Sequence, residues 1–179
     1  MENLKVVVDT NILVGGAYDE SSVAFKIIKE VIDGQLEAYA THQTMSENRQ
    51  ILRKLVRDRE YRELLEEFFR RLKIVKLTPS SPPPSFQEGE RETGSFSSMI
   101  RGRLRGGRVP VSDPEDVKLF ESSLAAEADY LITKDNEVLD VGEYHGTKVV
   151  TPEEFWAKYR DENDNGGAWG DWAKMIMGK

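Results

Sequence analysis

The sequence predicts an α/β fold in which helices pack on both sides of a mostly parallel sheet. Short apolar runs rich in valine and isoleucine alternate with longer segments whose apolar residues recur every three or four positions, as when strands alternate with amphipathic helices. The first run, at 4–8, is apolar almost throughout, as in a strand buried on both faces of a parallel sheet. A chain of 179 residues is long enough for one domain with its own core.

Strands and helices alternate over the first 77 residues. A helix between Ser22 and Gly34 is indicated by a serine cap at its start and a glycine stop at its end. Further elements are expected at about 36–40 (strand), 44–57 (helix), 60–72 (helix) and 73–77 (strand). The apolar residues that the helix at 44–57 is expected to bury are Ile51, Leu52, Leu55 and Val56.

A long segment at 78–109 interrupts this alternation. It contains three consecutive prolines together with several serines and glycines, and it has almost no periodic apolar pattern. A loop of this length inside a domain is usually either functional or disordered. We therefore expect a single domain at 1–160 with a flexible Pro/Ser/Arg-rich insert at about 78–110, followed by a C-terminal tail at 161–179.

The alternation resumes after the insert. The expected elements are a helix at about 114–128, strands at 130–133 and 148–150, and a last helix from Pro152. Thr151 is a capping residue for this last helix, which has proline in its first turn. In the tail, the spacing of Trp169 and Trp172 indicates a short amphipathic helix docked on the body or on a partner.

The composition excludes several kinds of site. The chain contains no cysteine, so it has no disulfide, no thiolate metal site and no cysteine nucleophile. Its first apolar run is too short for a signal peptide or a membrane span, and we expect a cytoplasmic protein without a membrane segment. The formal net charge of −7 disfavours a general nucleic-acid binder. A local exception lies between Ser97 and Pro110, where there are four arginines and no acid.

Three aspartates lie where predicted strands end or helices begin. Asp9 follows the first strand, Asp116 lies in the first turn of the helix after the insert, and Asp135 follows the strand at 130–133. In parallel α/β sheets, ligand sites form beyond the carboxyl ends of the strands, so these side chains can converge. Glu47 is a fourth candidate, because it borders the predicted buried face of its helix.

The four acids indicate a metal site, because clustered carboxylates repel one another unless cations are present. Hard divalent ions such as Mg²⁺ and Mn²⁺ prefer oxygen ligands. Two such ions roughly 4 Å apart can activate a water and stabilise the leaving oxygen of a phosphodiester. Zinc fits less well, since the chain has no cysteine and only two histidines, His42 and His145.

Each acid also has a structural interpretation, which stays open at this point. Asp9 and Asp135 can each cap the turn or short helix that follows them. Asp113 and Asp116 begin a helix that has a cap, a proline and acids at the positive end of its dipole. Glu47, taken alone, is also typical of a solvated helix residue.

Four pieces of the sequence match a known pattern when they are taken together and in order. They are 6–14, where an apolar strand runs into Asp-Thr-Asn, then 47–52, then 112–116 with 124–135, and finally 144–155. This order resembles that of the PIN-domain ribonuclease family, including its group of toxin components from toxin–antitoxin pairs. The resemblance covers about 4–157, less the insert.

The resemblance implies a three-layer α/β/α sandwich and an RNA substrate that is hydrolysed with Mg²⁺ or Mn²⁺ as cofactor. The residues that it implies as metal ligands and catalytic residues are Asp9, Glu47, Asp116 and Asp135. The residues that it implies as supporting polar groups are Thr10, Asn11 and Thr133, with Asp113 as an outer or alternative ligand.

The insert departs from the family pattern, because PIN toxins are usually shorter. Its basic residues are Arg101, Arg103, Arg105 and Arg108. They are expected to contact RNA phosphates as a mobile flap, and a solvated loop is the other interpretation.

A nuclease-inactive PIN module that binds RNA or a partner protein is the alternative to the enzyme. A transferase on another α/β fold is disfavoured, because the chain lacks a Gly-x-Ser-x-Gly elbow, a phosphate-binding loop and a dinucleotide fingerprint. Among nucleases, a toxin with an antitoxin partner, an RNA-processing enzyme and a homodimer are all compatible with the sequence.

Overall fold

A six-stranded sheet forms the centre of the computed structural model, which describes residues 3–77, 103–104, 107–108, 111 and 113–164. The strand order is β3-β2-β1-β6-β8-β7. The strands are β1 (Lys5–Val8), β2 (Glu37–Thr41), β3 (Lys73–Val75), β6 (Tyr130–Ile132), β7 (Glu143–Tyr144) and β8 (Thr147–Val150). All neighbouring pairs are parallel except β7 and β8, which are antiparallel. The predicted α/β fold with a mostly parallel sheet is confirmed.

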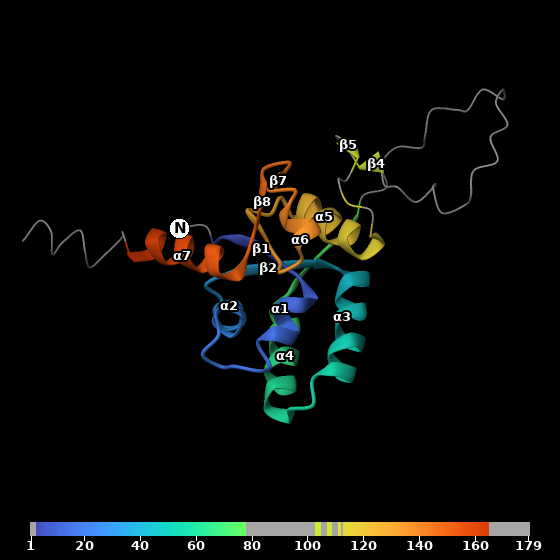
Figure 1. Ribbon diagram of the computed structural model, residues 1–179. Helices are drawn as coiled ribbons and strands as arrows, with labels where there is room; N and C mark the ends of the chain where they lie inside the picture. Colours follow the sequence, from blue (N-terminus) through green and yellow to red (C-terminus); the bar gives the residue numbers. More distant parts are fainter. Residues whose placement is uncertain (1–2, 78–102, 105–106, 109–110, 112, 165–179) are drawn as a thin grey trace, which may run out of the picture.

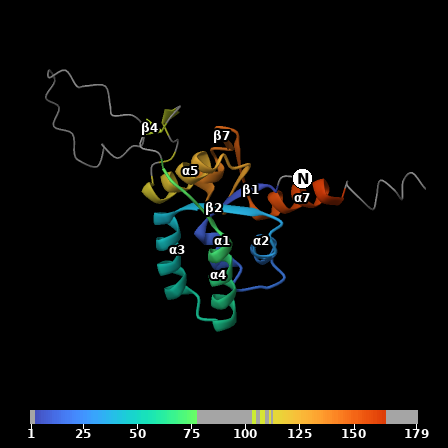
Figure 2. The same ribbon diagram turned by 180° about the vertical axis from the view of Figure 1, so that it is seen from behind.

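Helices cover both faces of the sheet (Figure 1). They are α1 (Thr10–Gly15), α2 (Val23–Ile32), α3 (His42–Leu55), α4 (Arg59–Arg71), α5 (Pro114–Ala126), α6 (Asn136–Leu139) and α7 (Pro152–Asp164). Helices α1 to α4 lie on one side and α5 and α6 on the other, and the view from behind in Figure 2 shows the same separation. Helix α7 lies at the side of the sheet and contacts α2 and β6.

The central strand β1 sends its side chains alternately into two cores. Val6 and Val8 belong to the core beneath α2 and α4, which includes Phe68, whereas Val7 belongs to the core beneath α5, which includes Phe120. All three valines of β1 are buried. Burial on both faces explains why the strand is apolar at successive positions instead of alternating with polar residues.

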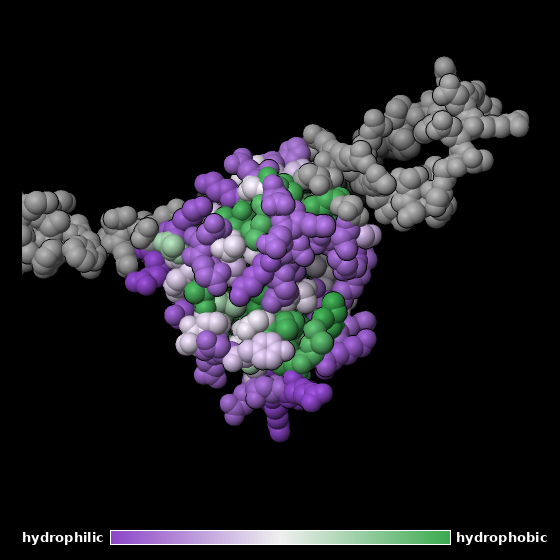
Figure 3. Space-filling model, in the orientation of Figure 1, coloured by the Kyte–Doolittle hydropathy of each residue, from purple (hydrophilic) through white to green (hydrophobic). Residues whose placement is uncertain are grey.

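Helix α3 differs from the prediction in the face that it buries. Leu52 and Val56 are buried, but Ile51 is 38% exposed and Leu55 is 55% exposed. The buried pair, Leu52 and Val56, follows the exposed pair, Ile51 and Leu55, by one residue. One residue corresponds to a rotation of about 100° around the helix axis. Helix α3 packs against α1, α4 and β2, and these neighbours leave Ile51 and Leu55 partly uncovered. Figure 3 shows apolar surface over the middle of α3.

Two elements outside the insert were not predicted from the sequence. Helix α1 follows β1 directly and is only six residues long, and β7 is only two residues long. Elements this short do not produce a visible apolar periodicity. The short helix α6 does begin after Asp135, as the capping interpretation expected.

Part of the predicted insert has regular structure. Arg103–Leu104 (β4) and Gly107–Arg108 (β5) pair as an antiparallel hairpin, in which Arg103 lies opposite Arg108. The sequence predicted a loop over this whole segment, and at these four residues the structure instead has two short strands. The rest of the insert, and Trp169 and Trp172 in the tail, lie outside the described residues.

The end of the domain also differs from the prediction, because α7 continues to Asp164, into the segment expected to be a tail. Its predicted start is confirmed. Thr151 Oγ1 accepts a hydrogen bond from the Glu154 amide at 3.2 Å, and the Glu154 carboxylate accepts one from the Thr151 amide at 3.0 Å. In the part of the chain that the structure describes, no helix is long and apolar enough to cross a membrane.

Candidate functional site

The parallel pairing of β1 with β6 brings Asp9 and Thr133 together at the carboxyl ends of these strands. Val8 pairs with Ile132, and the Asp9 amide donates to the Ile132 carbonyl at 3.0 Å. Thr133 Oγ1 then donates to Asp9 Oδ2 at 2.6 Å. Asp9 is thus fixed by the strand that precedes it and by the neighbouring strand.

The fully buried Thr133 hydroxyl is shared by three other groups. Besides donating to Asp9, its oxygen accepts from the Asp135 amide at 3.0 Å and from Asn11 Nδ2 at 3.4 Å. The buried Asn11 Oδ1 has no hydrogen-bond partner among the described residues. Thr133 and Asn11 therefore lie between the two strand-end aspartates, where supporting polar residues were expected.

Three of the aspartates cap helices, as the structural interpretation expected. Asp9 caps α1, Asp113 caps α5 and Asp135 caps α6. The caps of Asp113 and Asp135 accept backbone amides at 2.8 and 2.9 Å through Oδ1. A cap uses one carboxylate oxygen, so it leaves the second oxygen able to take another partner.

Asp116 has a different environment, because it does not cap its helix. Burial raises the pKa of Asp116 to about 6, and the negative charges of Asp135, Asp113, Asp9 and Glu137 add to this rise. Within the described residues, Asp116 forms no ion pair. It is therefore a carboxylate that lies among other carboxylates and is not paired with a described lysine or arginine.

Asp9 belongs to the same electrostatic group. Burial raises the pKa of its carboxyl above the usual value, and the charge of Asp135 adds to the rise. Hydrogen bonds from Thr133 and from the Asn11 and Thr10 amides act in the opposite direction. The three aspartates come from separate elements, and the charge of Asp135 raises the pKa of both Asp9 and Asp116.

Glu47 is paired with Lys118 and not with any of these three aspartates. Lys118 Nζ lies 2.9 Å from Glu47 Oε1 and 2.7 Å from Glu47 Oε2, and Gln43 Nε2 donates to Oε1 at 3.0 Å. The hydrogen bonds from Lys118 and Gln43 hold the pKa of Glu47 below its usual value. No aspartate contributes to that pKa.

The predicted convergence of four acids is therefore only partly present. The structure groups Asp9, Asp116 and Asp135, whereas Glu47 is engaged by a lysine. Within the described residues, no three His, Asp or Glu side chains are arranged so that they could already hold a metal ion.

Sequence reasoning missed two residues of this region. One is Lys118, for which the only sequence signal was its place two residues after Asp116. The other is the buried Asn48, whose side-chain oxygen accepts a hydrogen bond from Thr10 Oγ1 and so joins α1 to α3. Their roles depend on contacts between residues far apart in the sequence, which spacing along one helix does not reveal.

The arginines of the insert are described only through their backbone. Arg103 and Arg108 lie opposite each other in the β4–β5 hairpin, while Arg101 and Arg105 lie outside the described residues. Their contact with RNA remains a prediction.

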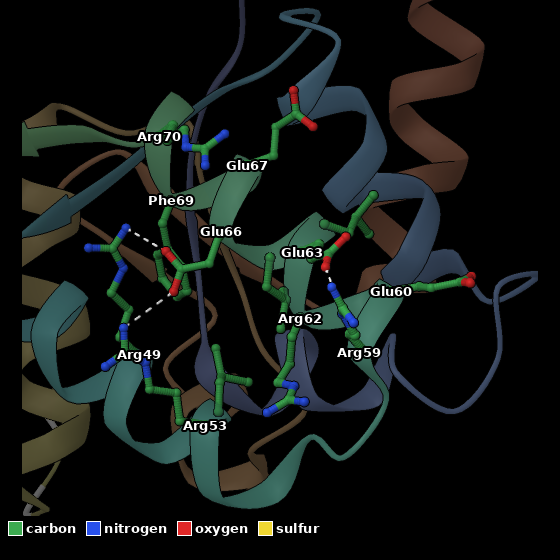
Figure 4. A pocket seen from close by; sticks show the side chains of 13 residues that line it. Arg49, Arg53, Arg59, Glu60, Arg62, Glu63, Glu66, Glu67, Phe69 and Arg70 are labelled. Atoms are coloured by element: carbon green, nitrogen blue, oxygen red, sulfur yellow. Dashed lines mark hydrogen bonds and ion pairs between the residues drawn. The ribbon is translucent and has the colours of Figure 1, made fainter.

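A hollow of about 890 Å³ lies between α3 and α4, away from the four acids (Figure 4). Its apolar lining includes Leu52, Leu65 and Phe69. An ion pair of 2.9 Å between Arg49 and Glu66 crosses from one helix to the other. None of the four candidate acids lines this hollow, so it is a feature of the helix pair and not part of the acid group.

The family model described as "PIN domain" matches residues 5–137, which is more than half of the chain. The matched region begins in β1, ends in α6 and contains all four candidate acids. The curated proteins and the solved structures gave no match to this chain.

Proposed function

Because this chain belongs to the PIN-domain family, a family of metal-dependent nucleases, we propose that it is an endoribonuclease that hydrolyses RNA phosphodiester bonds with Mg²⁺ or Mn²⁺. The observation that carries the proposal is the group formed by Asp9, Asp116 and Asp135 at the carboxyl edge of the sheet. Its members come from separate elements, and Asp116 lies among negative charges and has no ion-pair partner in the part of the chain that the structure describes. Such an arrangement is costly to a fold and is typical of functional sites.

The chemistry of the donor set fits a hard divalent cation. The group offers carboxylate oxygens, together with the buried and unpartnered Asn11 Oδ1, and it lacks cysteine. Oxygen ligands of this kind suit Mg²⁺ and Mn²⁺. Asp9, Asp116 and Asp135 are the residues that we propose to hold the ion, with Glu47 as the fourth ligand of the family pattern.

A bound Mg²⁺ or Mn²⁺ supplies charge stabilisation at the phosphoryl oxygens and lowers the pKa of water. The residues of the chain position the site for this chemistry. The Thr133 hydroxyl donates a hydrogen bond to Asp9 Oδ2 at 2.6 Å. The same hydroxyl accepts a hydrogen bond from the Asp135 backbone amide, which fixes the backbone there. Thr10, through Asn48, keeps the start of α1 against α3.

Cleavage of a labelled structured RNA by the purified protein tests the proposal. The wild type would be compared with Asp9→Asn and Asp116→Asn, each with Mn²⁺ and with EDTA. We expect cutting by the wild type with Mn²⁺ only, and a loss of at least about 100-fold in each variant, because each removes a charged ligand.

Asp58→Asn is a matched control. Asp58 caps α4 and accepts the Tyr61 amide at 2.7 Å, and asparagine caps a helix about as well as aspartate. This variant makes the same change of a carboxylate to an amide at a position outside the acid group. We expect it to cut RNA as the wild type does. Cutting that persists in Asp116→Asn would contradict the proposal. RNA binding without cutting under any condition would favour the inactive PIN module.

A further inference from the structure

Lys118 joins the two helical layers at the carboxyl edge of the sheet. It lies on α5, and its partner Glu47 lies on α3, on the other side of the sheet (Figure 1). The two side chains are mostly covered, with exposed fractions of 20% for Lys118 and 32% for Glu47. Lys118 lies two residues after Asp116 on the same helix, and the pair is partly desolvated, so it is stronger than an ion pair at the open surface.

The hydrogen bonds of both partners are occupied. Lys118 Nζ donates to the two oxygens of Glu47 and to Glu115 Oε1 at 2.9 Å, so all three of its protons have an acceptor. Each Glu47 oxygen has at least one donor. A metal ion that bound the Glu47 carboxylate would have to displace the Lys118 ammonium group from its oxygens.

The aspartates are outside this arrangement. The charges that act on Asp116 come from Asp135, Asp113, Asp9 and Glu137, and Glu47 is not among them. Conversely, the groups that act on Glu47 are Lys118 and Gln43. The acid group is therefore divided into three aspartates that form no ion pair within the described residues and one glutamate that is paired with Lys118.

We propose that Lys118 is a positioning residue that holds Glu47 away from the aspartates, so that its ammonium group and the metal ion compete for the same carboxylate. The inference rests on the proposed function, since it takes the aspartates as the first site of metal binding. Asp9, Asp116 and Asp135 would hold the ion first, and Glu47 would become available to it only once Lys118 no longer engages its carboxylate.

Mn²⁺ binding measured by titration calorimetry, without RNA, tests this competition. Lys118→Gln keeps a polar side chain of similar reach but removes the charge. We expect it to bind Mn²⁺ roughly 3- to 10-fold more tightly than the wild type, the range that follows from losing a partly exposed ion pair. Glu47→Gln in the wild-type background should change the affinity by less than about 2-fold, because Glu47 is engaged by Lys118.

The double variant Lys118→Gln/Glu47→Gln separates competition from a general change in charge. Competition requires that the gain of Lys118→Gln disappear when Glu47 is also replaced, and a gain that persists would overturn the proposal. Lys73→Gln is the matched control. It breaks the 2.6 Å ion pair with Glu37, at the opposite end of the sheet, and should leave Mn²⁺ affinity unchanged.

Two further outcomes keep the inference distinct from the proposed function. If Asp116→Asn abolishes Mn²⁺ binding but Lys118→Gln leaves the affinity unchanged, the metal site stands and the role of Lys118 is rejected. If the wild type binds no Mn²⁺, both are rejected. Should Lys118→Gln fail to fold, the Mn²⁺ affinity of Glu47→Gln tests the proposal alone. A loss of affinity of more than about 10-fold would show that Glu47 is already a ligand and would overturn the role of Lys118.

Discussion

At the scale of single residues, the aspartates differ in what balances their charge. Asp9 and Asp135 receive hydrogen bonds from backbone amides and, for Asp9, from Thr133. Asp116 has only the burial and the like charges that raise its pKa to about 6. Of these three carboxylates, Asp116 is the one that accepts no hydrogen bond within the described residues, and its pKa is raised to about 6.

Asp116→Asn is predicted to stabilise the metal-free protein near neutral pH. The folded-state pKa of about 6 lies above the ordinary value of 3.8, so the favourable contribution of the protonated carboxyl is complete below pH 3.8 and is lost as the pH rises through 6. The gain, up to ~1 kcal/mol after solvent screening, should appear as a Tm increase of roughly 1–4 °C at pH 7.5 in EDTA.

The same comparison at two pH values provides the control. At pH 4 both proteins carry a neutral group in the folded state, so the difference in Tm should shrink toward zero. With Mn²⁺ at pH 7.5 the order should reverse, because the wild type alone retains the full ligand set. A stabilisation that is equal at both pH values would show that charge repulsion is not its cause.

At the scale of elements, α1 is held against α4 by one buried hydrogen bond. Tyr61 Oη donates to the Leu13 carbonyl at 2.7 Å. Gly16 lies directly beside this hydroxyl, and a Cβ at this position would overlap with it. The short helix that follows Asp9 is thus positioned by a tyrosine from another helix.

Tyr61→Phe is predicted to destabilise the protein by about 1–2 kcal/mol, because it leaves a buried carbonyl without its donor. Urea unfolding measures the change. Tyr39→Phe is a suitable comparison, since the Tyr39 hydroxyl donates to a carboxylate, Glu37, that also pairs with Lys73. An equal loss in both variants would argue against a special role for the α1–α4 contact.

Helix α3 provides a second prediction at this scale. Leu52→Ala should cost about 2–5 kcal/mol, whereas Ile51→Ala should cost less than about 1 kcal/mol, because only Leu52 is buried. The two neighbouring aliphatic residues serve as each other's control in urea unfolding. A similar cost for both would mean that Ile51 is covered in solution by another molecule.

The same helix shows what sequence reasoning could and could not provide. Apolar periodicity predicted that α3 exists and roughly where it lies, because this information is local. It did not determine which part of a broad apolar stripe is covered, since that depends on α1, α4 and β2. Likewise, the strand ends predicted the positions of Asp9 and Asp135, but the engagement of Glu47 by Lys118 requires α3 and α5 to be placed in space.

At the scale of the whole molecule, the two cores share one sheet. Phe120 is buried on the α5 side, and Phe155 is buried on the side of α2 and α7, where its ring lies 5.2 Å from that of Tyr130. Adjacent residues of β1 and β6 contribute to opposite cores. Loss of packing on either face therefore weakens the same strands.

Phe120→Ala and Phe155→Ala are each predicted to cost about 3–5 kcal/mol, and each variant should still unfold in a single transition. Circular dichroism and tryptophan fluorescence in urea, recorded on the same samples, measure both features. Phe25→Ala, at a partly buried position, should cost less. Two separated transitions would show that the faces of the sheet unfold independently.

The pairing of β1 with β6 joins residues that are made far apart in time. Asp9 and Thr133 lie 124 positions from each other in the chain. A protein leaves the ribosome from its amino end, so Asp9 and Glu47 emerge long before Asp116 and Asp135 are synthesised. For the nuclease that we propose, a growing chain therefore cannot cut the message from which it is being translated until Asp116 and Asp135 have been made.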